Sequence, residues 1–221
     1  MKKIILSTAS ALALFAASPA FADPGTESFV TQGGNGGVVQ VDQYDHNQYS
    51  YINQEGTQET VFVDQQGFID PTYGDNKSNI YQATVSDNPY SWGERFSTVA
   101  SVQQMGEANV SYINQDAGFD QQAFVTQIGA GNQVNAHQSG AGNSLTVNQG
   151  SQIASGLSNS SNSDQTGFWN AASVTQNGSS NGSDLYQSGD FNTTTLSQKS
   201  DGNYSSINQA GGGNLVTVTQ N

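Results

Sequence analysis

The sequence predicts an all-β fold, a β-solenoid (β-helix) of ~22-residue coils, each built from two 7-residue strands joined by 4-residue turns. The first observation is an 11-residue repeat, Gln-x-Gly-x-x-Asn-x-x-x-x-x-Gln, which occurs twice without a gap from Gln127 and Gln138. The second is the alternation of polar and apolar residues within that repeat. The third is the composition, because 34% hydrophobic residues, 25 Gly and no Cys are too polar for a conventional globular core.

Each repeat contains one strand and one turn. Asn and Gln stand at the two ends of a 7-residue span, an even number of positions apart, so they lie on the same face of an extended strand. In the unit 132–138 the inward residues are Asn132, Val134, Ala136 and Gln138, and the residues between them face water. The four remaining residues fit a tight turn, with Gly where a positive φ is needed.

The N-terminus is typical of a secretory signal peptide covering residues 1–22. Two lysines precede an apolar run over residues 4–17, and Ala20-Phe21-Ala22 is a small-x-small cleavage site. The run is shorter than the roughly 20 residues of a membrane-spanning helix. We therefore expect a mature repeat domain of residues 23–221, with three basic against 18 acidic residues and a formal net charge of −15.

The repeat continues through most of the mature domain. The predicted strand units are 26–32, 37–43, 48–54, 59–65, 76–82, 98–104, 109–115, 121–127, 132–138, 143–149, 170–176, 181–187, 192–198, 203–209 and 214–220. Three segments interrupt them and are possible loops, at residues 66–75, 83–97 and 150–164.

Two of these segments leave alternatives open. The unit around 87–93 contains Pro89 and is either an edge-like strand or a bulged loop, since Pro cannot donate to a ladder. Residues 150–163 are a loop or a poorly packed coil with Ser161 and Ser163 inward. Counting both, about 17 units make roughly eight coils and a rod about 40 Å long, with no cap at its C-terminal end.

The Asn and Gln positions are the candidate functional residues, as an assembly ladder in which each inward amide stacks on its counterpart one coil away. The predicted ladder consists of Gln104, Asn109, Gln115, Gln127, Asn132, Gln138, Asn143, Gln149, Gln165, Asn170, Gln176, Asn181, Gln187, Asn192, Gln198, Asn203, Gln209, Asn214 and Gln220.

The repeat resembles that of the curlin family, the subunits of bacterial curli fibres. All four motif positions are filled in copies that start at Gln104, Gln127, Gln138, Gln165, Gln176, Gln187 and Gln209. The resemblance implies a secreted structural subunit that polymerises into extracellular, cell-surface amyloid fibres of cross-β structure, for biofilm matrix and adhesion. Its implied partners are further copies of itself, a nucleator subunit, an outer-membrane secretion pore and a periplasmic chaperone. A role as the minor nucleator subunit of the same fibre is an alternative.

Composition argues against other chemistry. We predict no enzyme activity, cofactor or metal site, because the only two histidines, His46 and His137, are far apart in sequence and the carboxylates lie in turns. Nucleic acid is not an expected partner, since Lys77, Arg95 and Lys199 are the only basic residues after the signal peptide.

A monomeric β-solenoid binding module, such as a surface adhesin or an ice-binding rod, is the alternative from another class. Ice binding needs a flat outward ladder of one residue type, commonly Thr. Thr193, Thr195, Thr217 and Thr219 suggest one, but the corresponding positions in other units are Ala171/Ser173, Asp184/Tyr186 and Tyr204/Ser206. From the sequence we therefore conclude that the ladder does not persist.

Overall fold

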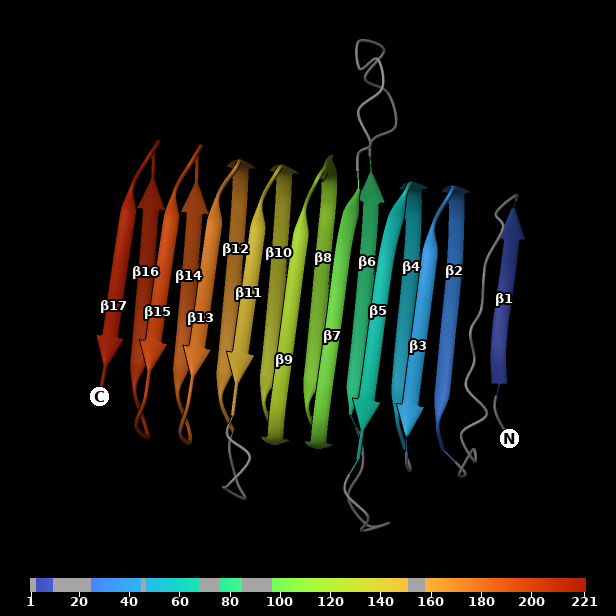
Figure 1. The fold of residues 1–221 in the computed structure, drawn as a ribbon, viewed down its shortest axis with the longest axis horizontal. Helices are drawn as coiled ribbons and strands as arrows, with labels where there is room; N and C mark the ends of the chain where they lie inside the picture. The colour runs from blue at the N-terminus through green and yellow to red at the C-terminus, as the bar shows by residue number, and fades with distance from the viewer. Residues whose placement is uncertain (1–2, 10–24, 45–46, 68–75, 85–96, 151–157) are drawn as a thin grey trace.

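The computed structural model describes residues 3–9, 25–44, 47–67, 76–84, 97–150 and 158–221. These residues form parallel strands stacked into a two-layered rod, which confirms the predicted β-solenoid (Figure 1). The described residues include no helix that is long and apolar enough to cross a membrane.

The strands recur at regular intervals along the chain. Their bounds are β1 Lys3–Ala9, β2 Glu27–Asn35, β3 Val38–Tyr44, β4 Tyr49–Thr57, β5 Glu59–Gln66, β6 Lys77–Thr84, β7 Thr98–Glu107, β8 Val110–Phe119, β9 Gln122–Ala130, β10 Gln133–Ala141, β11 Ser144–Gln149, β12 Ser160–Phe168, β13 Ala171–Gln176, β14 Gly182–Ser188, β15 Thr193–Gln198, β16 Tyr204–Ala210 and β17 Leu215–Gln220.

Successive strands alternate between two sheets. Sheet A has the order β1-β2-β4-β6-β8-β10-β12-β14-β16, and sheet B has the order β3-β5-β7-β9-β11-β13-β15-β17. The strands of sheet A point up in Figure 1 and those of sheet B point down. Equivalent residues pair in register, as Gln138 does with Gln115 and with Gln165. Each repeat therefore lies directly over the repeat two positions away in sequence.

The core fills the space between the sheets with one inward pair from each strand. Sheet A contributes mainly Ser and Ile, as in Ser50 and Ile52, and sheet B contributes mainly Val, as in Val61 and Val63. All four of these side chains are at most 2% exposed. The predicted facing of the strands is thus correct, and the small inward residues allow the two sheets to pack closely.

The turns contain two left-handed positions, of which the sequence indicated one. The motif Gly has a positive φ, for example 103° at Gly129 and 100° at Gly140. The residue before the motif Asn also has a positive φ, and it is often not Gly, as at Ala108 (53°) and Phe191 (59°). A left-handed conformation costs a non-Gly residue roughly 1–2 kcal/mol. The hydrogen bonds between stacked coils hold these residues in the left-handed conformation despite this cost.

One predicted unit has no place in the ladder. Residues 87–93 lie outside the described residues, but β5 pairs directly with β7 in sheet B, and β6 pairs directly with β8 in sheet A. No rung remains between these neighbours for a strand from 87–93. The rod from β2 to β17 therefore has eight coils, and every strand from β7 onward lies in the opposite sheet from the one that a count including 87–93 would assign.

Of the two alternatives for residues 150–163, a loop or a coil with Ser161 and Ser163 inward, the structure has the coil from Ser160 onward. Residues 151–157 lie outside the described residues, but β12 begins at Ser160 and pairs with β10 and β14 along its length. Asn159 and Gln165 occupy the two amide positions, with Ser161 and Ser163 buried between them. Stacked amides and backbone pairing therefore form a strand even where the inward pair is polar. In the other two predicted loops, Gln66 belongs to β5, and Ala83 and Thr84 belong to β6.

Candidate functional site

Two continuous rows of glutamine side chains run the length of the rod, one in each sheet. In every row, Nε2 of one Gln donates to Oε1 of the Gln one rung nearer the C-terminus, over 2.7–3.0 Å. The sheet A row is Gln32, Gln54, Gln82, Gln115, Gln138, Gln165, Gln187 and Gln209. The sheet B row is Gln43, Gln65, Gln104, Gln127, Gln149, Gln176, Gln198 and Gln220.

A second hydrogen bond fixes the direction of these rows. Nε2 of a ladder Gln also donates to the backbone carbonyl of the facing sheet, as Gln176 does to Ser160 and Gln198 to Gly182, each over 3.0 Å. Only the nitrogen side of the amide can make this contact, so every Oε1 faces the N-terminal end of the rod. The rows are therefore polar, and their N–H donors face the C-terminal end.

The asparagine side chains form matching rows of opposite sense. Oδ1 of Asn170 accepts both the backbone N–H and Nδ2 of Asn192, over 3.0 and 3.1 Å. Nδ2 of Asn192 also donates to the carbonyl of Gly211 in the following coil, over 2.8 Å. Each Asn thus ties its own turn to the coils on both sides, and its Oδ1 faces the C-terminal end of the rod.

The Asn row breaks where the motif Gly is missing. Carbonyl groups of motif glycines accept the Asn Nδ2 of the preceding coil, as Gly178 does from Asn159. The turn after Gln198 has Ser200 at the Gly position, and Ser200 is not among the residues with positive φ. The buried Nδ2 of Asn181, which should bond to this turn, has no partner within the described part of the chain. The glycine therefore aims a carbonyl at the neighbouring coil as well as closing the turn.

The structure places the predicted ladder residues inside the rod, except at its C-terminal end. Of the 19, all but Asn203, Asn214 and Gln220 are buried. Sequence reasoning left out of the ladder Gln32, Gln43, Gln54, Gln65, Asn76, Gln82 and Asn159, although the even spacing of inward positions already applied to them. The role of the rows in joining separate copies remains a prediction.

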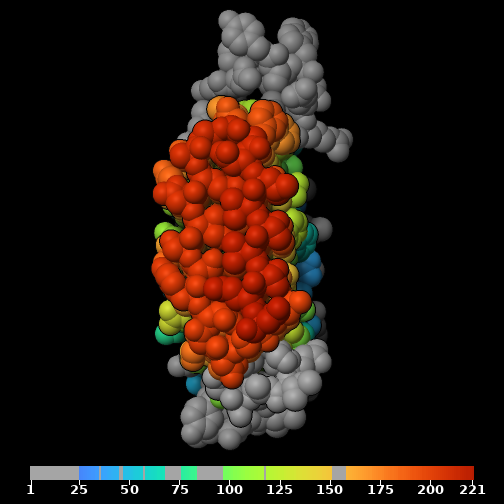
Figure 2. Space-filling model, turned by 90° about the vertical axis from the view of Figure 1, so that its left-hand side faces the viewer, coloured from blue at the N-terminus to red at the C-terminus, as the bar shows by residue number. Residues whose placement is uncertain are grey.

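The C-terminal end of the rod presents ladder groups to solvent. Nε2 of Gln220 donates to the carbonyl of Tyr204 over 2.9 Å, and no described Gln lies beyond it to accept a second bond. Oδ1 of Asn214 likewise has no donor among the described residues. Leu215 is 73% exposed, and Val216 and Val218 are half-buried. Figure 2 looks onto this end of the rod, which is covered by the residues of the C-terminal strands, in red.

The N-terminal end presents the complementary groups. Strand β3 is the edge of sheet B, and Oε1 of its Gln43 has no donor in the described ranges, whereas Nε2 donates to Gln65 over 2.8 Å. In sheet A, β1 pairs with β2 and covers its edge, with Thr8 opposite Gln32. In the glutamine rows, the C-terminal end therefore offers donors and the N-terminal end offers acceptors.

Other candidate chemistry is sparse in the described residues. These contain no group of three or more His, Cys, Asp or Glu side chains that could hold a metal ion. His137 faces outward and contacts Asp164, with Nδ1 to Oδ1 at 3.1 Å. The pKa of Tyr81 is raised by partial burial and by nearby carboxylates, and that of Tyr204 is raised by its hydrogen bond to Asp184. These are surface contacts of single side chains.

A comparison with protein families points to the same repeats. The model of the curlin associated repeat matches residues 156–189 and again residues 189–221, which contain β12 to β17. No curated protein and no solved structure matches the chain. Curlins are structural amyloid subunits and do not form an enzyme family.

Proposed function

We propose that this chain, which belongs to the curlin family by its repeats, is a secreted subunit that polymerises end to end into extracellular amyloid fibres for biofilm matrix and adhesion. The observation that carries the proposal is the pair of unfinished, complementary ladder ends. The amide rows and the sheets stop at β16 and β17 with hydrogen-bonding groups still directed outward. Unpaired edges of this kind add further strands.

The contact between two copies follows from the register of the rod. Strand β2 of an incoming copy continues sheet A beyond β16, and its β3 continues sheet B beyond β17. Gln209 and Gln220 then donate to Gln32 and Gln43 of that copy. These bonds have the same direction as every Gln–Gln hydrogen bond inside the rod. Reversing the incoming copy would place N–H donors opposite N–H donors. The fibre is therefore polar, with a C-terminal end joined to an N-terminal end at every junction.

Apolar contacts favour the same arrangement. Val216 and Val218 of β17 are half-buried at the open end, and Val39 and Val41 hold the same positions in β3. Stacking places each pair of valines over the other and completes their burial. Removing apolar surface from water contributes about 25 cal/mol per Å². Each added copy also gains a full set of ladder hydrogen bonds.

Signal peptide cleavage exposes the N-terminal edge of sheet A, which end-to-end assembly requires. In the 221-residue chain, β1 pairs with β2 and occupies the edge that the preceding copy would use. Cleavage after Ala22 removes β1 and frees that edge. A chain kept uncleaved would therefore elongate from one sheet only. Export through an outer-membrane pore, with a periplasmic chaperone and a nucleator subunit, is part of the proposal through the family resemblance.

Polymerisation of the mature chain separates this function from the alternatives. Purified residues 23–221 are followed for hours by size-exclusion chromatography, with and without preformed fibres. A fibre subunit leaves the monomer peak, and added fibres remove the lag. A monomeric binding rod stays in the peak under both conditions, and this result would refute the proposal. A nucleator forms fibres itself and also shortens the lag of a separate major subunit.

A further inference from the structure

Ahead of the ladder Gln, the outer face of sheet B is uncharged from β7 to β17. Each of these six strands presents three outward side chains before its ladder Gln, and the strands pair in register. Eleven of these 18 positions are Ser or Thr, and none is charged. The three outward residues are Thr193, Thr195 and Ser197 in β15, and Leu215, Thr217 and Thr219 in β17. Small side chains in straight columns make this face flat.

This face corrects two of the three comparisons behind the sequence-based conclusion that the Thr ladder does not persist. Asp184/Tyr186 and Tyr204/Ser206, which seemed to interrupt it, belong to β14 and β16 of sheet A and lie on the opposite side of the rod. The true neighbours of β15 are β13 and β17, with Ser173 and Thr217 beside Thr195. The outward Ser and Thr residues of these coils are therefore concentrated on sheet B.

Acidic residues are excluded from this face but not from the opposite one. Over the same coils, the outer face of sheet A contains Asp164 in β12 and Asp184 in β14. On the described strands of sheet B, the outward acidic residues ahead of the ladder Gln are Asp42 and Asp64, in β3 and β5 near the N-terminal end, and Glu107 lies beyond the ladder Gln, at the end of β7. In a mature chain with a formal net charge of −15, the β7–β17 face is where two copies can approach without opposing carboxylates.

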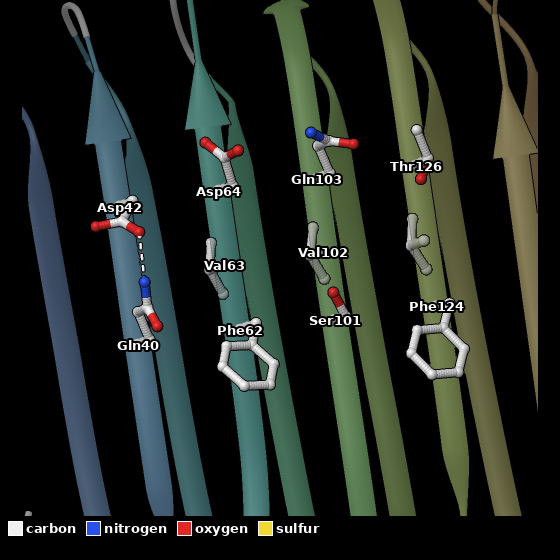
Figure 3. A pocket seen from close by; sticks show the side chains of 11 residues that line it. Gln40, Asp42, Phe62, Val63, Asp64, Ser101, Val102, Gln103, Phe124 and Thr126 are labelled. Carbon is white, nitrogen blue, oxygen red and sulfur yellow. Dashed lines mark hydrogen bonds between the residues drawn. The ribbon is translucent and has the colours of Figure 1, made fainter. Parts of the chain in front are cut away.

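One hollow interrupts the flat face. Phe62 of β5 and Phe124 of β9 project on either side of Ser101 of β7, in a hollow of about 340 Å³ that extends from β3 to β9 and is also lined by Asp42 and Asp64 (Figure 3). Phe62 and Phe124 are 42% and 39% exposed. An aromatic ring from an opposing copy fits over the small Ser101. Each Phe can therefore border the hollow on its own rod and fill the hollow on the opposing rod.

We propose that the outer face of sheet B is a lateral contact surface, through which two fibres of this chain pair side by side. The inference rests on the proposed fibre and names a second contact within it. The hydroxyl groups are less costly to remove from water than carboxylates, and two flat, small-residue sheet faces can interdigitate as dry interfaces. The Phe side chains supply the apolar contact.

The size of the face explains why pairing needs the fibre. Six strands at ~4.8 Å spacing and about 20 Å long present roughly 580 Å² per copy, or about 1,150 Å² for the two copies together. Stable interfaces bury about 1,200–2,000 Å², so single copies would pair weakly. Along a fibre the contact repeats with every subunit, and the weak contacts add as in a multivalent complex. Pairing should therefore follow polymerisation.

Charge placed on one face or the other tests the proposal. The double variant Thr146→Asp/Thr195→Asp adds two carboxylates to sheet B, and the matched control Asn135→Asp/Ser206→Asp adds two to the outer face of sheet A. Seeded elongation gives the growth rate, and electron microscopy gives the fraction of paired fibres. We expect the sheet B variant to elongate like the control but to have a paired fraction lower by about fivefold or more, because like charges then face each other.

A neutral pair of variants guards against an effect of charge alone. Phe124→Ala should lower the paired fraction, whereas Tyr112→Ala, which removes an exposed ring from sheet A, should not. Equal pairing in sheet A and sheet B variants, with normal elongation, would overturn the lateral contact alone. A wild-type chain that forms no fibres would overturn the proposed function and the lateral contact together.

Discussion

The amide nitrogen of Gln198 donates to the amide oxygen of Gln220 over 2.8 Å, and there the sheet B row of glutamines ends. Gln198 makes the two contacts of an interior rung, to Gln220 and to the carbonyl of Gly182. Gln220 makes only the second kind, to the carbonyl of Tyr204. The last residue of the row has the same chemistry as every residue before it and lacks only a neighbour, so its ability to bind is already formed when a second copy arrives.

The first prediction compares two glutamines of one strand. Gln138→Ala should lower the free energy of unfolding by about 1–3 kcal/mol, because Nε2 of Gln115 loses one of its two acceptors and Oε1 of the buried Gln165 loses its donor. Gln133→Ala, on the outer face of β10, should change it by less than about 0.5 kcal/mol. Urea unfolding of the fresh monomer measures both. Equal losses would contradict the buried ladder.

The second prediction concerns the break at Ser200. Ser200→Gly should let the turn adopt the conformation of the other motif glycines and bring a carbonyl to Nδ2 of Asn181, which is buried without a partner. We expect a gain of about 1 kcal/mol in unfolding free energy. Ser179→Gly, in a turn that already has its motif glycine, is the control and should give no gain. A Ser200→Gly variant no more stable than wild type would show that the glycine does not aim the carbonyl.

The third prediction separates folding from assembly with one substitution at two glycines. A Cβ at Gly140 would lie 2.1 Å from the carbonyl oxygen of Gly167 in the next coil, so Gly140→Ala should destabilise the monomer. At Gly211 the nearest atom is 3.9 Å away, because no described coil follows. Gly211→Ala should fold, yet clash with the next copy and stop growth.

Seeded elongation measures this difference. Substoichiometric Gly211→Ala should slow the growth of wild-type fibres, because each added copy blocks the end that it joins. Gly213→Ala is the control, since it alters the same turn and a Cβ there meets nothing within 4 Å. Growth of Gly211→Ala at the rate of this control would mean that the next copy does not stack over the turn.

The fourth prediction uses deletions in which the shorter one does more harm. Removing residues 166–187 deletes one whole coil of 22 residues and keeps every later strand in its own sheet. Removing residues 177–187 deletes half a coil and moves β15, β16 and β17 to the opposite sheets. β17 would then end sheet A and β16 would end sheet B, so an incoming β2 could no longer continue sheet A beyond β16. We expect seeded growth with the long deletion and little with the short one. Equal growth would argue against alternating sheets.

That contrast also explains what the sequence could and could not predict. The facing of each strand followed from even spacing, because a strand turns its side chains to opposite faces at successive residues. The sheet to which a strand belongs depends on counting every earlier strand, and residues 87–93 had the length of a unit without its pattern. A count that includes them would place every later strand in the wrong sheet. Local periodicity is therefore robust, whereas the alternation depends on long-range pairing.

Reasoning from the sequence misjudged the Ser/Thr face and left β12 open between a loop and a poorly packed coil. Thr195 was compared with Tyr186 and Ser206, which lie on the other side of the rod, on an equal footing with Ser173 and Thr217, its neighbours in sheet B. Strand β12 was doubted because Ser161 and Ser163 are polar, yet Asn159 and Gln165 supply its ladder bonds. In this fold the amide positions define a strand better than its apolar pair does.

Disulfide cross-linking within fibres tests the central claim, that the C-terminal coil of one copy stacks on the N-terminal coil of the next. The chain has no Cys, and the register places Thr217 of one copy beside Gln40 of the next, as Thr217 lies beside Thr195 within a copy. Paired strands lie ~4.8 Å apart, within reach of a disulfide. Fibres grown from a mixture of Thr217→Cys and Gln40→Cys chains should give mixed dimers on oxidation, and the double variant should give a ladder of longer covalent oligomers. Fully oxidised fibres of the mixture that contain no mixed dimers would contradict the account.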